Sequence, residues 1–200
     1  MLINKIKQIL YFSILLLTFT SCKTDNPVDV NIPSNSVLLP LDVGNSWTFR
    51  RTVYNTDGSI NYSDTITQKI VKDSSLYGFK WSFESYEQIL FQNDEQGLWV
   101  FYAEPRLYYR YPSFRNVNFV QNFDTVTVIS TDTLVTTPAG TFHCYHYRID
   151  FNNFPINQFI CPDLGFVNME YGYYYPTPPY SRLESYLWIR LELLSYNIKK

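Results

Sequence analysis

Apolar and polar residues alternate along much of the chain, which is the pattern of β-strands with one buried face. In residues 79–91, Phe79, Trp81 and Phe83 fall on one face of the predicted strand, and Lys80 falls on the other. Aromatic and β-branched residues, which favour strands, are frequent in such segments. The pattern predicts strands over residues 46–54, 60–73, 79–91, 98–104, 106–112, 116–123, 125–137, 141–151, 156–161, 166–175 and 183–198.

Residues with turn preferences separate these segments. Asp57 and Gly58 suit a tight hairpin. Pro138 suits the second position of a type I turn, and Gly140 can adopt the positive φ of the bulge that follows it. Connections this short join antiparallel neighbours, so the predicted strands follow one another as a meander.

The last segment, residues 183–198, fits two patterns. Its leucines have the spacing of a helical stripe, and its alternate positions also place apolar side chains on one strand face. The aromatic and β-branched residues within it, such as Trp188 and Ile189, favour the strand. Residues 37–200 are therefore predicted to be one all-β domain, a curved antiparallel meander sheet that forms a half-barrel or barrel.

The first residues have a different pattern, that of a secretory signal. Lys5 and Lys7 precede the apolar stretch 9–19, which is shorter than the ~20 residues that a membrane-spanning helix needs. The polar stretch 22–36 follows, and its prolines prevent the apolar helix from continuing. We expect a signal helix in residues 1–21 and a flexible tether in residues 22–36.

Residues 19–22, "FTSC", resemble the lipobox of bacterial lipoproteins. The resemblance implies that Cys22 receives a lipid, that cleavage removes residues 1–21, and that the mature protein is anchored to a membrane. It places the protein in the bacterial cell envelope, with the outer membrane as the expected location. The alternative is a buried cysteine at the end of a core helix, which the polar stretch after Cys22 disfavours.

Composition narrows the range of functions. The chain has 18 Tyr, 15 Phe and 4 Trp in 200 residues, and these can fill a large core. Its net charge is −2 and its lysines and arginines are scattered, so it lacks the basic face that nucleic acid binding requires. We expect no nucleic acid partner.

Three phrases in order resemble the TapB-type family, a domain of unknown function. They are "LPLDVGNSWTF" at residues 39–49, "TPAGTFHCYHY" at 137–147 and "CPDLGFVNMEYG" at 161–172. The resemblance implies a curved antiparallel sheet similar to the LolA/LolB half-barrels that carry lipoproteins. It implies no established activity and no functional residue beyond the lipid anchor.

Cys144 and Cys161 are candidates for a disulfide, which export would permit. They lie at equal distances from Asn152 and Asn153, so a hairpin with a two-residue loop there would place them opposite each other. Counting outward puts them at a non-hydrogen-bonded pair, with Cα atoms about 4.5 Å apart, which a disulfide tolerates. Two buried free thiols are the alternative.

The segment of residues 171–182 is rich in tyrosine and proline. Its Tyr173, Tyr175 and Tyr180 are candidates for an aromatic surface that contacts a sugar or a peptide. The other interpretation, which we favour, is a strand that runs into a rigid loop over the barrel end.

No motif for catalysis, metal or cofactor binding is found in the sequence. It has no G-x-S-x-G, phosphate-binding loop, zinc spacing or EF-hand, and His143 and His146 are expected on opposite strand faces. We expect no enzyme activity, no cofactor and no metal. A glycosidase would need two carboxylates, but the acidic residues are scattered and we expect them on the solvated surface. They include Glu84, Glu87, Asp94, Glu95 and Glu170.

Two functions follow as hypotheses. The first is an envelope lipoprotein whose curved sheet binds an apolar ligand or an envelope protein. The second is a structural or surface-interaction module whose interior is filled by its own aromatic side chains. A third hypothesis, which the sequence supports less, is a carbohydrate-binding or hydrolytic protein.

Overall fold

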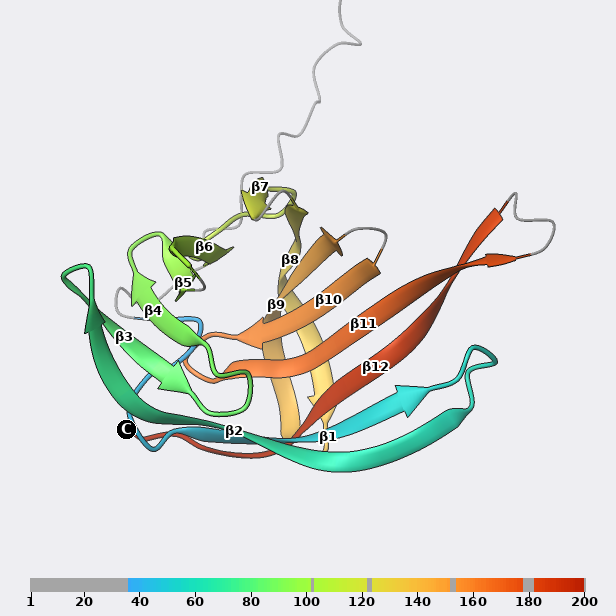
Figure 1. Ribbon diagram of the computed structural model, residues 1–200, viewed down its shortest axis with the longest axis horizontal. Helices are drawn as coiled ribbons and strands as arrows, with labels where there is room; N and C mark the ends of the chain where they lie inside the picture. The colour runs from blue at the N-terminus through green and yellow to red at the C-terminus, as the bar shows by residue number, and fades with distance from the viewer. Residues whose placement is uncertain (1–35, 102, 122–123, 152–153, 178–181, 200) are drawn as a thin grey trace, which may run out of the picture. The chain divides into compact units, whose positions relative to one another are not determined.

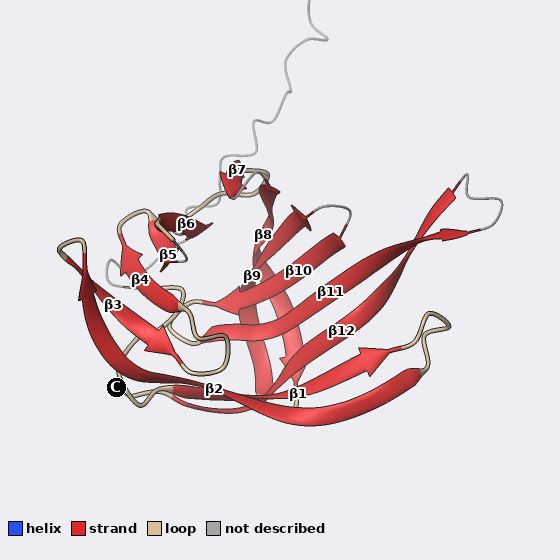
Figure 2. Cartoon of the chain, in the orientation of Figure 1, coloured by secondary structure: helices blue, strands red, loops and turns tan. Residues whose placement is uncertain are grey.

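The computed structural model describes residues 36–101, 103–121, 124–151, 154–177 and 182–199. The predicted signal helix in residues 1–21, Cys22 and nearly all of the tether lie outside these residues. Pro33–Lys200 form one compact unit, which contains every strand described below, and we expect it to fold by itself. Figure 2 shows strands joined by loops throughout this unit.

The described residues of this unit form 12 strands, and most bounds lie within a few residues of the predicted ones. The single strand predicted over residues 79–91 is wrong, because residues 85–89 form a loop between two strands. They are β1 Ser46–Tyr54, β2 Ile60–Leu76, β3 Phe79–Glu84, β4 Leu90–Asp94, β5 Gly97–Phe101, β6 Pro105–Arg110, β7 Asn118–Gln121, β8 Asp124–Thr137, β9 Gly140–Phe151, β10 Phe154–Cys161, β11 Gly165–Thr177 and β12 Arg182–Asn197. The final segment is a strand, as predicted, and not a helix.

All 12 strands belong to one antiparallel sheet in the order β6-β5-β4-β3-β2-β1-β12-β11-β10-β9-β8-β7. Strands that are consecutive in sequence pair with each other, except β6 and β7, which are the two edges of the sheet, and β1 also pairs with β12. The order is therefore that of an up-and-down barrel opened between β6 and β7, and Figure 1 shows these two edges curling toward each other. The predicted all-β fold, a curved antiparallel sheet nearly closed into a barrel, is confirmed.

The ladders align inward-facing side chains in rows across the sheet, because neighbouring strands keep paired residues side by side. We call two of them the distal row and the middle row. The distal row consists of Tyr62, Val53, Ile189, Tyr171, Ile156, Ile149 and Val126. The middle row consists of Asp64, Arg51, Leu191, Met169, Gln158, Tyr147 and Val128.

Beyond the middle row, at the end away from the distal row, the interior is filled. Trp47 and Phe49, two residues apart on β1, are both buried. The Trp47 indole nitrogen donates to the Leu164 carbonyl over 2.5 Å. Gly165 is required beside it, because a Cβ there would lie 2.6 Å from a Leu39 methyl group and the φ of this residue is +99°.

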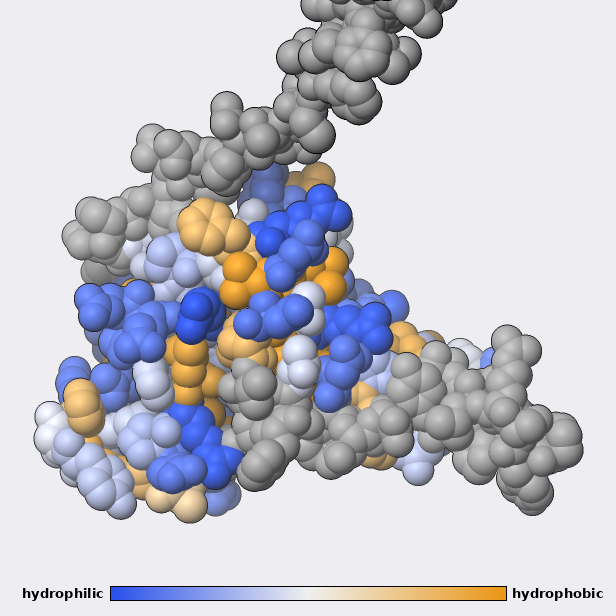
Figure 3. Space-filling model, turned by 90° about the horizontal axis from the view of Figure 1, so that it is seen from above, coloured by the Kyte–Doolittle hydropathy of each residue, from blue (hydrophilic) through white to orange (hydrophobic). Residues whose placement is uncertain are grey.

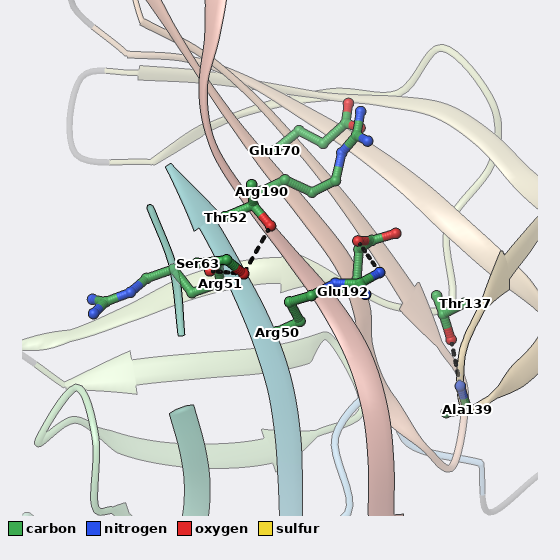
Figure 4. Close-up of polar contacts among 9 residues, drawn as sticks. All are labelled: Arg50, Arg51, Thr52, Ser63, Thr137, Ala139, Glu170, Arg190 and Glu192. Carbon is green, nitrogen blue, oxygen red and sulfur yellow. Dashed lines mark hydrogen bonds and ion pairs between the residues drawn. The ribbon is translucent and has the colours of Figure 1, made fainter. Parts of the chain in front are cut away.

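The outer face of the sheet carries ion pairs between neighbouring strands. Figure 4 shows Arg50 paired with Glu192, and Arg190 beside Glu170, across β1, β12 and β11. These pairs are partly exposed, so each contributes at most about 1 kcal/mol. Arg51, which follows Arg50 on β1, projects to the opposite side, toward the interior.

The seam between the two sheet edges is closed by aromatic side chains. Tyr109, at the end of β6, packs on Tyr147 of β9 with ring centroids 4.7 Å apart. The Tyr147 hydroxyl donates to the Arg110 carbonyl over 2.8 Å. Burial raises the pKa of Tyr147 well above its ordinary value, so the hydroxyl keeps the proton that it donates.

Tyr147→Phe tests this closure. The change removes the hydrogen bond that the buried Tyr147 side chain makes to the Arg110 carbonyl, and we expect it to lower the free energy of unfolding by about 0.5–1.5 kcal/mol. Tyr196→Phe is the matched control, because the Tyr196 side chain is exposed and its hydroxyl is solvated. Urea unfolding of residues 33–200 measures both. Equal stability of the two variants would contradict a role for this bond.

Candidate functional site

The interior of the sheet is not filled completely. A cavity of about 400 Å³ lies between strands β1, β2, β10, β11 and β12 on one side and β4, β6 and the β3–β4 loop on the other. Two of its lining residues, Tyr86 and Trp188, are 39% and 42% exposed, so the cavity opens to solvent. Figure 3 shows apolar side chains between hydrophilic ones on this part of the surface.

Apolar side chains make most of the cavity wall. Leu191 and Met169 come from the middle row, and Ile189 comes from the distal row. Phe91 of β4 faces them from the opposite wall, and Phe166 of β11 completes the floor. The alternation of each strand turns these positions inward, and the curvature of the sheet brings the two walls together.

Arg51 brings the positive charge into the cavity wall, but this charge is already paired. Its Nε donates to Asp64 over 2.9 Å, a second guanidinium nitrogen bonds the same carboxylate, and Nη1 donates to the Tyr86 hydroxyl over 3.0 Å. The Arg51 hydrogen bond lowers the pKa of Asp64. The same bond raises the pKa of Arg51. Asp64 therefore holds the charged Arg51 side chain in a fixed position in the cavity wall.

Glu84 corrects one sequence prediction, because it is not on the solvated surface. Its side chain is only 3% exposed, and its two carboxylate oxygens accept the backbone N–H groups of Tyr86 and Glu87, each over 2.6 Å. These bonds fix the β3–β4 loop at the mouth of the cavity. Partial burial of the Glu87 carboxyl, together with the negative charge of Glu84, raises the pKa of Glu87, which also lines the cavity.

Gln158 is a polar residue in the cavity wall. It occupies an inward position of β10 between Tyr147 and Met169 in the middle row, and its side chain is 3% exposed. Its Oε1 is buried and has no hydrogen-bond partner among the described residues. The sequence carried a signal for this residue, because Gln158 interrupts the apolar positions Ile156 and Ile160 on the same strand face.

The tyrosine-rich segment is only partly described. Tyr173 is 38% exposed and contacts Phe154, Tyr186 and Trp188, with ring centroids 4.9, 5.9 and 6.2 Å away. Because Trp188 also lines the cavity, these four aromatic side chains, which we call the aromatic rim, adjoin its opening. The Tyr175 side chain and Tyr180 lie outside the described residues.

The register of the predicted cysteine hairpin is confirmed. β9 and β10 pair from Phe151↔Phe154 to Ile160↔Tyr145, and Cys144 and Cys161 occupy the next step of this register. Both thiols are free in the structure, so the disulfide stays a prediction. The Cys144 thiol donates to the Phe142 carbonyl over 3.8 Å, and the Cys161 thiol donates to the Pro162 carbonyl over 3.5 Å. The interaction between the two neighbouring thiols raises the pKa of Cys144 and lowers that of Cys161.

Other groups that could bind a ligand are engaged or dispersed. His143 contacts the Asp132 carboxylate over 2.5 Å, and His146 contacts Asn157 over 3.0 Å. Within the described part of the chain, no group of three or more His, Cys, Asp or Glu side chains could hold a metal ion. No helix in that part is long and apolar enough to cross a membrane.

The cysteine pair leads to a prediction about reactivity. Cys161 has the lowered pKa, so its thiolate fraction increases at a lower pH than for an ordinary thiol, and iodoacetamide should modify it before the buried Cys144. Oxidation of the pair would close a loop of roughly 18 residues and should stabilise the fold by roughly 3 kcal/mol. Mass spectrometry of the alkylated protein and urea unfolding with and without reductant measure these effects. Faster labelling of Cys144, or unchanged stability after oxidation, would contradict the prediction.

The comparisons with known proteins give two similar structures. No protein-family model matches the chain, and no curated protein matches it. A protein inferred to be exported, with a YmcC-like fold, from Bacteroides fragilis NCTC 9343 is 12% identical, with a TM-score of 0.45 over 81% of this chain and 99% of that one. An inferred lipoprotein from Parabacteroides distasonis ATCC 8503 is 12% identical, with a TM-score of 0.40 over the same shares. The resemblance to the TapB-type family therefore rests on the sequence phrases alone.

Proposed function

We propose that the mature protein is a non-enzymatic lipoprotein of the bacterial cell envelope, anchored to the outer membrane through Cys22, whose cavity binds a small and mainly apolar molecule. The anchor rests on the sequence of residues 1–22. Ligand binding rests on one observation, the solvent-open cavity of about 400 Å³ with mainly apolar walls. Binding sites for small molecules have this character and volumes of roughly 300–1,000 Å³.

The competing hypothesis is a module with a self-filled interior. Aromatic side chains such as Trp47 and Tyr147 do fill one end of the interior. They leave the space between Met169, Leu191 and Phe91 unfilled, although native interiors are normally packed to high density. A space of this size beside a packed core supports ligand binding over a purely structural role.

The residues of the cavity wall support a binding role over catalysis. Among the described residues that line it there is no histidine, cysteine or serine, so the usual pairing of a nucleophile with a base is missing. Arg51 is engaged by Asp64, and Glu87 is the only carboxylate among the described lining residues, so a second one to share acid–base work is missing there.

The aromatic rim favours an envelope protein as a second candidate partner. Tyr173 and Trp188 are exposed beside the cavity opening, and aromatic side chains of this kind are enriched at protein interfaces. A protein that docks there would be placed to deliver or receive the bound molecule.

Filling the cavity tests the binding proposal. Residues 33–200 should increase the fluorescence of the neutral probe N-phenyl-1-naphthylamine, and Ile189→Trp should reduce its affinity at least tenfold, because the larger side chain occupies the cavity. Ile60→Trp is the matched control, since Ile60 is 63% exposed and does not line the cavity. No binding by the unchanged protein, or equal binding by both variants, would count against the proposal.

The anchor is tested in the full-length protein. Cys22→Ala removes the acceptor thiol, so we expect the protein to lose incorporation of labelled fatty acid and to leave the membrane fraction. Cys161→Ala is the control, because the anchor does not depend on it. Continued acylation and membrane association of the Cys22→Ala protein would contradict the proposed lipid anchor.

A further inference from the structure

Gln158 restricts the chemistry of the molecule that the cavity binds. We propose that this ligand is neutral and carries one O–H or N–H group on an apolar body, and that this group donates a hydrogen bond to Gln158 Oε1. The inference rests on the proposed function, because it requires that the cavity bind a small molecule. It adds the chemical class of the ligand and the residue that selects it.

The neighbours of Gln158 in the middle row leave its oxygen without a donor. Tyr147 pairs with it from β9, but the Tyr147 hydroxyl already donates to the Arg110 carbonyl over 2.8 Å. Met169 pairs with it from β11 and has a thioether, which carries no proton to donate. The adjacent inward positions of β10, Ile156 and Ile160, are apolar.

A buried hydrogen-bond acceptor without a partner is energetically unfavourable. The unpaired Oε1 of Gln158 in the cavity wall therefore indicates that a molecule in the cavity supplies the donor. Gln158 lines the cavity, and a rotation of its side chain would present the amide oxygen to a donor there. A bound water could also supply the hydrogen bond. A ligand with its own donor can replace that water and keep the bond, whereas a ligand without one loses it.

The charges around the cavity favour a neutral ligand. Arg51 carries the one guanidinium among the described lining residues, and it is engaged by Asp64 and Tyr86. The Glu87 carboxyl lines the same cavity and would repel an anion. The apolar floor of Phe166, Met169 and Leu191 would desolvate a cation, and among the described lining residues only the Glu87 carboxyl at the cavity mouth could offset part of that cost.

Two probes of nearly equal shape distinguish the contribution of the hydrogen-bond donor to binding from that of the apolar body. 4-Hexylphenol has a hydroxyl donor, and 4-hexylanisole replaces the proton by a methyl group. Isothermal titration of residues 33–200 should show at least tenfold tighter binding of the phenol, which corresponds to about 1.4 kcal/mol. Gln158→Met keeps the length of the side chain and removes the acceptor, so this preference should disappear. Thermal unfolding of this variant checks its fold.

Gln92→Met is the matched control, because Gln92 is a half-buried residue of β4 that does not line the cavity, and it should keep the preference. Equal binding of both probes by the unchanged protein would overturn the inference and leave the proposed function intact. A preference for the phenol that persists in Gln158→Met would also overturn it, since the donor would then be recognised elsewhere. Binding of neither probe would count against the inference and the proposed function together.

Discussion

The antiparallel ladder between β1 and β12 is the contact on which the rest of the structure depends. It runs from Ser46↔Asn197 to Val53↔Ile189 and joins the two ends of the strand series. Without it, β1–β6 and β7–β12 would be two separate meanders. Because the ladder joins residues so far apart in sequence, much loop entropy must be lost before it forms, and we expect slow folding.

The same ladder sets the site. By aligning β1 with β12 it places Arg51 beside Leu191, and the neighbouring ladders continue this row to Met169 and Gln158. The inner face of the sheet thus changes from a packed aromatic end to an open end across one row of side chains. Two polar residues of this row differ in their surroundings. Arg51 is paired with Asp64. Gln158 lines the cavity, which another molecule can enter.

Glu84 shows how the second wall is held in place. Its buried carboxylate binds two backbone N–H groups of the β3–β4 loop, which keeps Tyr86 and Glu87 over the cavity mouth. Tyr86 in turn bonds Arg51 on the facing wall. The loop and the sheet are therefore linked by polar contacts across the opening, while the floor of the cavity is apolar. This arrangement suits a ligand that has both a polar group and an apolar body.

Alternation and turn residues in the sequence were sufficient to predict the all-β class, the strand at residues 182–197 and the register of β9 with β10. These features depend on local periodicity and short loops. They were not sufficient for the buried position of Glu84, since alternation assigns a side chain to a face but does not say what covers that face. They also could not locate the cavity. Which end of the interior is filled, and whether Gln158 finds a donor, depends on how far the sheet curls and which distant side chains then meet, and only the tertiary structure decides this.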